Sequence, residues 1–87
     1  MNRDEIRNIV FDCIPTSHIH IPRREMAESL RLVDDLGMDS LDIHELVYDS
    51  CDELNIGYED IDIKKLDRNW KTLGDLVDMF ENHLNNC

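Results

Sequence analysis

The first apolar pattern in the chain is helical. Four apolar residues recur at the i, i+3, i+4, i+7 spacing of one helix face, namely Ile6, Ile9, Val10 and Cys13. Asn2 followed three residues later by Glu5 is typical of a helix start. Pro15 disfavours helical conformation in the residue before it. The sequence therefore predicts an amphipathic helix that ends near Ile14.

The apolar residues between this helix and Gly37 do not follow a sustained helical or strand spacing. Residues 16–22 form a short, polar stretch, which is typical of a loop. Residues 23–31 have room for a helical turn with Met26 and Leu30 facing inward, so we expect loop with partial helix there. Three apolar residues are then expected to hold the loop against the core: Leu32, Val33 and Leu36. Gly37 follows, in a turn that we expect to need a conformation disfavoured by a Cβ atom.

A second helical pattern runs from about Ser40 to Leu54. Its buried stripe is expected to be marked by Leu41, Leu46, Val47 and Leu54. When the stripe is read from Ile43, Ser50 falls at a position that would normally be apolar. We expect the Ser50 hydroxyl to bond to a carbonyl one turn earlier, which makes a buried serine tolerable.

Residues 58–66 are ambiguous. Tyr58, Ile61 and Ile63 alternate as in a strand, whereas Asp60 could cap a short helix. We interpret the segment as a short helix, because no other segment has the period of two that a partner strand would need.

The last helical pattern is the clearest. Thr72 and Asp75 form a variant of the capping box. Five apolar residues follow at helical spacing: Leu73, Leu76, Val77, Phe80 and Leu84. Three longer helices plus one short helix predict an all-α fold, a small four-helix bundle, in a single domain spanning residues 1–87.

Charge narrows the classes of partner. The 87 residues include 20 acidic and 9 basic residues, for a formal net charge of −11. Residues 34–62 contain eleven acidic residues and no Lys or Arg. Such a chain is not expected to bind nucleic acid or an anionic membrane surface, and it is expected to attract basic proteins.

The cysteines and the N-terminus indicate a compartment. Cys13, Cys51 and Cys87 are odd in number and widely spaced, without the clustering of a zinc site or a disulfide scaffold. The first residues lack the apolar run of a signal peptide, and no stretch approaches transmembrane length. We expect a monomer in the cytoplasm, with no membrane span.

Asp39 and Ser40 stand where a Gly-containing turn gives way to the second helix. A helix start offers unpaired backbone N–H groups and the positive end of the macrodipole, which suit a phosphodiester on the serine hydroxyl. From this spacing alone, the default interpretation is that Asp39 caps the helix and that Ser40 is unmodified.

A wider set of residues resembles a known family. The run Leu32-Val33-Asp34-Asp35-Leu36-Gly37-Met38-Asp39-Ser40-Leu41-Asp42, continued by Glu45-Leu46-Val47, is similar to the prosthetic-group site of acyl carrier proteins. The later Thr72-Leu73-Gly74-Asp75-Leu76-Val77 resembles the start of that family's last helix. With the first helix, the likeness covers essentially the whole chain.

The resemblance implies that Ser40 is esterified by 4′-phosphopantetheine, whose thiol carries acyl groups as thioesters. It implies that Asp39 belongs to the modification motif and that Leu41 helps to dock partner enzymes. Acidic side chains on the second helix would meet basic patches on those enzymes. By position these are Asp42, Glu45 and Asp52, with Asp49 and Glu53 added because we expect them to be exposed.

The implied partners are a phosphopantetheinyl transferase and acyl-transferring or condensing enzymes with basic docking patches, and the chain itself would not be an enzyme. The pathway would be fatty-acid biosynthesis or a specialised lipid, secondary-metabolite or protein-acylation system. An acyl chain lying between the helices would meet residues that core packing explains equally well: Ile43, Leu46, Val47, Ile56 and Leu76. His44, Ser50 and a long 58–71 stretch depart from the family pattern, and they weaken the case for a pocket of the usual kind.

Other functional classes fit the sequence less well. The main alternative is an unmodified acidic helical module that binds a basic partner. His18 and His20 with Asp34 or Asp35 lack a fixed third ligand, so no metal site is expected. Ser40 has no Gly-x-Ser-x-Gly elbow, which argues against a hydrolase. Cys51 is read as a buried side chain rather than a nucleophile, because acidic surroundings would raise its pKa.

Overall fold

The computed structural model describes residues 2–14, 21–57, 59, 61 and 71–85. Within them the elements are α1 (Arg3–Cys13), the 3-10 turn η1 (Arg23–Glu25), α2 (Ser40–Leu54) and α4 (Leu73–Asn85). The described part contains no strand beyond one isolated antiparallel bridge between Arg31 and Thr72. The predicted all-α fold is confirmed.

α1 and α4 begin as their sequences predict. The Asn2 side chain caps α1 by accepting a hydrogen bond from the backbone N–H of Glu5 at 2.9 Å. At the start of α4, the N–H of Asp75 donates to Thr72 Oγ1 at 3.2 Å, and the N–H of Thr72 donates to Asp75 Oδ2 at 3.0 Å. Each pair satisfies N–H groups that have no acceptor within the helix.

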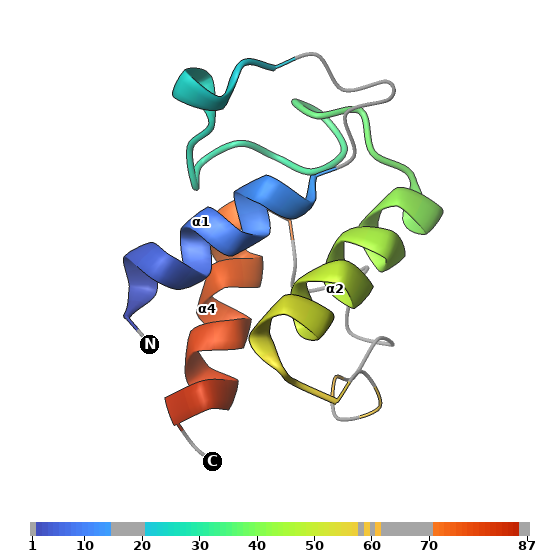
Figure 1. Cartoon of the computed structure of the whole chain (residues 1–87). Helices are drawn as coiled ribbons and strands as arrows, with labels where there is room; N and C mark the ends of the chain where they lie inside the picture. Colours follow the sequence, from blue (N-terminus) through green and yellow to red (C-terminus); the bar gives the residue numbers. More distant parts are fainter. Residues whose placement is uncertain (1, 15–20, 58, 60, 62–70, 86–87) are drawn as a thin grey trace.

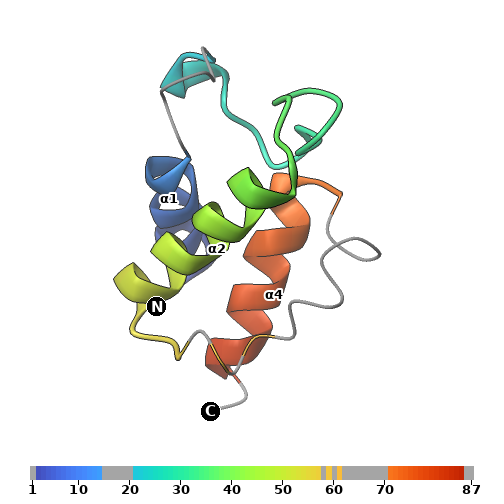
Figure 2. The same cartoon turned by 90° about the vertical axis from the view of Figure 1, so that its right-hand side faces the viewer.

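The core lies where α1 packs against both α2 and α4 (Figures 1 and 2). Each helix contributes side chains with no exposed surface, among them Ile6, Val10, Leu46, Val47, Leu73, Leu76, Val77 and Phe80. Residues 21–39 run across the end of the bundle at which α2 begins (Figure 1). In this segment Leu32 and Leu36 are buried, while Met26 and Leu30 are half-buried against the core, as predicted.

Two expected core residues are exposed. Leu41 is 66% exposed and Val33 is 60% exposed. The buried face of α2 is set by Ile43, and a residue two positions earlier on a helix lies on the opposite side. Val33 stands next to Leu32 in a tight turn, and only one of two neighbouring side chains can point inward there.

The expected short helix over residues 58–66 lies outside the described residues, except for Glu59 and Ile61. Glu59 is exposed and Ile61 is buried. No helix in the described part of the chain has the length and apolar character needed to cross a membrane.

Candidate functional site

The turn before α2 is closed by backbone hydrogen bonds. The N–H of Leu36 donates to the carbonyl of Arg31, that of Gly37 to Val33 and that of Met38 to Leu32, each at 3.0 Å. Gly37 has a φ of 68°, in the left-handed region that favours glycine. Met38 is then buried, and the chain turns outward at Asp39.

This turn is also fixed to the start of α4. The N–H of Leu32 donates to the carbonyl of Lys71 at 2.8 Å, and the N–H of Leu73 donates to the carbonyl of Leu30 at 3.0 Å. The N–H of Gly74 donates to the carbonyl of Glu28 at 2.8 Å. The segment that leads into α2 is therefore held by main-chain contacts to residues about 40 positions away.

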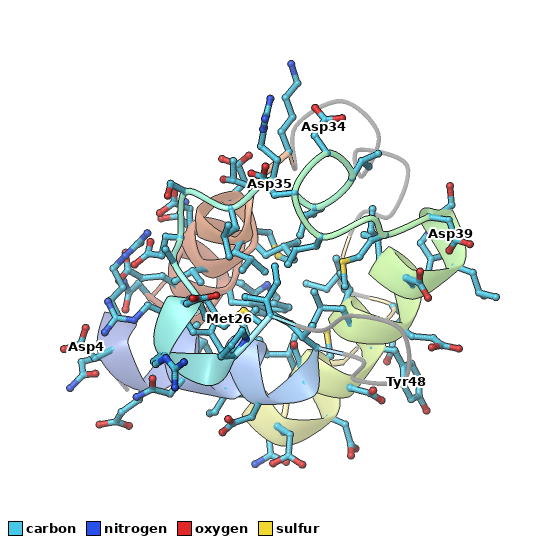
Figure 3. The ribbon with its side chains drawn as sticks, turned by 90° about the horizontal axis from the view of Figure 1, so that it is seen from above. Asp4, Met26, Asp34, Asp35, Asp39 and Tyr48 are labelled. Carbon is cyan, nitrogen blue, oxygen red and sulfur yellow. The ribbon has the colours of Figure 1, made fainter. Side chains whose placement is uncertain are left out.

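Asp39 caps α2 and presents Ser40 at its first position. Asp39 Oδ1 accepts from the N–H of Asp42 at 2.9 Å, and Asp42 Oδ2 accepts from the N–H of Asp39 at 3.2 Å, which forms a capping box. Asp39 lies at the outer end of α2 (Figure 3), and the side chains of Asp39 and Ser40 are both exposed. Ser40 is thus open to solvent at the start of α2.

The predicted docking residues lie on the solvent side of α2. Leu41, Glu45, Asp49, Asp52 and Glu53 are exposed, and Asp42 is half-buried beside the capping box. α2 contains five acidic residues: Asp42, Glu45, Asp49, Asp52 and Glu53. It has no Lys or Arg. Ser40 therefore stands at one end of a negatively charged helix face.

Tyr48 is a residue of this face that the sequence pattern did not single out. It is 58% exposed and points outward from α2 (Figure 3). Leu41, Glu45, Tyr48 and Asp52 recur at i, i+4, i+7 and i+11, which places them in one row on the helix. The spacing of seven between Leu41 and Tyr48 is the signal that would have identified it.

The opposite side of α2 holds Ser50 and Cys51. Ser50 is fully buried, and within the described residues its hydroxyl has no hydrogen-bond partner, so the predicted bond to a carbonyl is wrong. The Cys13 thiol lies close by, and burial raises its pKa while the contact with Ser50 lowers it by less. Burial raises the pKa of Cys51 to about 11. Cys51 is therefore a protonated core side chain, as predicted, but burial and not the acidic surroundings is the cause.

Known proteins with similar sequences decide the family. Over 83 residues, covering 95% of this chain and 96% of the relative, the chain is 34% identical to an acyl carrier protein of Thermotoga maritima. It is 33% identical over 85 residues to an acyl carrier protein of Lactobacillus johnsonii, covering 98% of this chain and 100% of that protein. The chain belongs to the acyl carrier protein family. No family model and no solved structure matches it.

The residues that the family resemblance implies around an acyl chain belong to the core of this carrier-family protein. The five residues expected to line an acyl chain are all buried members of one core: Ile43, Leu46, Val47, Ile56 and Leu76. His44, a departure from the family pattern, is half-buried. A pocket of about 440 Å³ lies between α1 and residues 26–28, with no lining residue from α2. Core packing therefore accounts for the burial of the five residues.

Metal binding has no support in the described residues, where no group of three or more His, Cys, Asp or Glu side chains is placed to hold an ion. His18 and His20 lie outside them. Asp35 instead accepts a hydrogen bond from the backbone N–H of Arg31 at 2.7 Å, and this bond lowers the pKa of its carboxyl group.

Proposed function

We propose that this protein is an acyl carrier whose 4′-phosphopantetheine group is attached to Ser40. The observation that carries the proposal is the exposed serine at the first position of a capped helix, in a chain that belongs to the acyl carrier protein family. The whole chain, residues 1–87, would act as one carrier domain. The group supplies a thiol on which acyl groups are held as thioesters.

The residues around Ser40 fit such a group. Helix geometry leaves the backbone N–H groups of Ser40 and Leu41 without an acceptor in the helix, and both favour a nearby phosphate. The carboxylates of Asp39 and Asp42 stand on the same turn and repel it. The N–H groups of Ser40 and Leu41 would hold the phosphate of a bound group against this repulsion, and its thiol would be available to partner enzymes.

The acidic face of α2 is the proposed docking surface for those enzymes. Exposed carboxylates at Glu45, Asp49, Asp52 and Glu53 attract basic patches, and the exposed apolar side chain of Leu41 adds contact area beside the attachment point. A phosphopantetheinyl transferase and acyl-transferring or condensing enzymes are the proposed partners. We place this carrier in the cytoplasm as a monomer, in fatty-acid biosynthesis or in a specialised lipid, secondary-metabolite or protein-acylation pathway.

Intact mass spectrometry tests the attachment. After incubation with coenzyme A and a phosphopantetheinyl transferase, the protein should gain one phosphopantetheinyl unit. Ser40→Ala should abolish the gain, and Ser29→Ala, at an exposed serine outside the helices, should leave it unchanged. An unmodified protein after treatment with several transferases would favour the alternative, an acidic interaction module without a prosthetic group.

Charge reversal tests the docking face. The double variant Glu45→Lys/Asp49→Lys should raise the KM of the transferase and flatten its dependence on salt, because it removes attraction at the helix that bears Ser40. Glu5→Lys/Glu25→Lys makes the same change in net charge at exposed sites away from α2. Equal effects of the two double variants would mean that net charge alone guides the enzyme.

A further inference from the structure

A second pocket lies at the C-terminal half of α2. It has a volume of about 240 Å³ and is lined by Tyr48, Cys51, Asp52, Ile56 and Glu59. The first three residues come from α2, and the other two come from the segment that follows it. None of them takes part in the attachment site at Ser40.

The lining combines three kinds of surface. Cys51 and Ile56 are buried and form an apolar base, with 1% and 8% of their surface exposed. Tyr48 contributes an aromatic side chain, and 58% of this residue is exposed. Asp52 and Glu59 contribute two exposed carboxylates. An anion would be repelled from this pocket, and a purely apolar group would leave both carboxylates unused.

Arginine matches all three surfaces at once. Its alkyl stem packs on apolar side chains, while its planar guanidinium group donates to carboxylates and stacks on an aromatic ring. Lysine matches the carboxylates, but its compact and strongly hydrated ammonium group gains less from the ring.

We propose that this pocket receives an arginine side chain of a partner enzyme, and that Tyr48 makes the pocket prefer arginine over lysine. The proposal rests on the carrier function above, because it assigns one anchor within the docking face. Tyr48 is eight residues after Ser40, which corresponds to about 12 Å along the helix. An arginine held there would fix the orientation of the partner relative to the attachment point.

Amide NMR titrations of the full-length, unmodified protein test the pocket directly. The probes are N-acetyl-arginine amide, N-acetyl-lysine amide and the uncharged N-acetyl-citrulline amide. The arginine probe should shift the amide signals of the five lining residues at lower concentration than the lysine probe, and the citrulline probe should leave them unchanged. Equal, diffuse shifts along α2 with arginine and lysine would overturn the proposal.

Two pairs of variants separate the ring from the charge. Tyr48→Leu should weaken binding of the arginine probe about two- to fivefold, whereas Tyr48→Phe should retain it, because the ring face is kept. Asp52→Asn should weaken binding, whereas Glu53→Gln, at a neighbouring carboxylate outside the lining, should not. Unchanged binding by Tyr48→Leu or by Asp52→Asn would contradict the assignment.

The Ser40→Ala variant and the modified protein distinguish this proposal from the carrier function. Both should bind the arginine probe as the unmodified protein does. If modification of Ser40 blocks the probe, the arm itself occupies the pocket and the proposal fails while the carrier function stands. If the probe binds as expected and no transferase modifies Ser40, the arginine pocket stands and the carrier function fails.

Discussion

Gly37 is the residue on which the entry to α2 depends. Its φ of 68° is strained for any side chain with a Cβ atom, although nothing lies within 4 Å of where that atom would stand. Gly37→Ala should therefore lower the free energy of unfolding by about 1–2 kcal/mol through backbone strain alone. Urea unfolding measures the change.

Gly37→Asn is the matched control for this effect. Asparagine tolerates the left-handed region better than alanine, so this variant should be less destabilised even though its side chain is larger. If the two variants lose the same stability, the conformation of Gly37 is not the cause.

Ser50 is a buried polar group that lowers stability. Its hydroxyl is fully buried and has no partner among the described residues, which costs about 1–3 kcal/mol relative to a satisfied or apolar group. Ser50→Ala should be neutral or should raise the free energy of unfolding by about 1 kcal/mol in urea. Ser40→Ala, at the exposed serine, should change it by less than about 0.5 kcal/mol. A clear loss of stability in Ser50→Ala would mean that the hydroxyl makes a bond.

At the scale of the elements, the starts of α1 and α4 could be predicted from local sequence signals. The residues on the buried face of α2 could be predicted only in part. Asn2 with Glu5 and Thr72 with Asp75 mark helix starts through hydrogen bonds within four residues. The start of α2 at Ser40 was equally visible because its cap is adjacent. Leu41 was misplaced because Ile43 sets the buried face of α2, and a residue two positions earlier lies on the opposite side of the helix.

Arg3 joins three parts of the fold. Its guanidinium contacts the carboxylates of Glu28, of Asp78 at 2.5 Å and of Glu81 at 3.5 Å, and thus links α1 to α4 and to residue 28. The Arg3 hydrogen bond lowers the pKa of Glu28 below its ordinary value of 4.5. The stabilisation of the fold by the Arg3–Glu28 pair is therefore complete above pH 4.5. It is lost as the pH falls through the lower pKa that Glu28 has in the folded protein.

Glu28→Gln should accordingly lower the free energy of unfolding at pH 7 by about 0.5–1 kcal/mol, since the pair is partly exposed. The difference from the unaltered protein should shrink as the pH falls well below 4.5. Urea unfolding at several pH values measures it, with the exposed Glu25→Gln as control. A difference that stays constant down to pH 2 would show that the Glu28 charge contributes nothing.

At the scale of the whole molecule, charge repulsion opposes folding. A formal charge of −11 is carried by a chain whose extents are 34 × 26 × 20 Å. At 0.01 M salt the screening length is about 30 Å, so charges repel across the entire fold, and at 0.15 M it is about 8 Å.

Salt should therefore stabilise the protein. A gain on the order of 1 kcal/mol between 0.01 and 0.15 M salt would raise Tm by about 4–8 °C in a domain of this size. NaCl and KCl should act alike, because screening does not depend on which monovalent cation is present. A Tm that is independent of salt would show that the acidic residues are spaced too widely to repel.

The long-range ties of the fold were not visible in the sequence. Leu30, Leu32 and Glu28 bond through main-chain groups to residues 71–74, and backbone atoms carry no residue-specific signal. The turn and the cap at Ser40 could be located from the local sequence, and it was the resemblance to acyl carrier proteins that made this serine the candidate site. What holds that turn in place could be seen only once the distant segment was placed beside it.

These ties have a consequence for biosynthesis. During translation, Ser40 leaves the ribosome well before Lys71 and Leu73, so at that stage the turn that precedes it has its internal hydrogen bonds but not its bonds to residues 71–74. Ser40 therefore reaches its final setting only after residues 71–74 have emerged, and an enzyme that recognises the proposed site through this setting would act after that point.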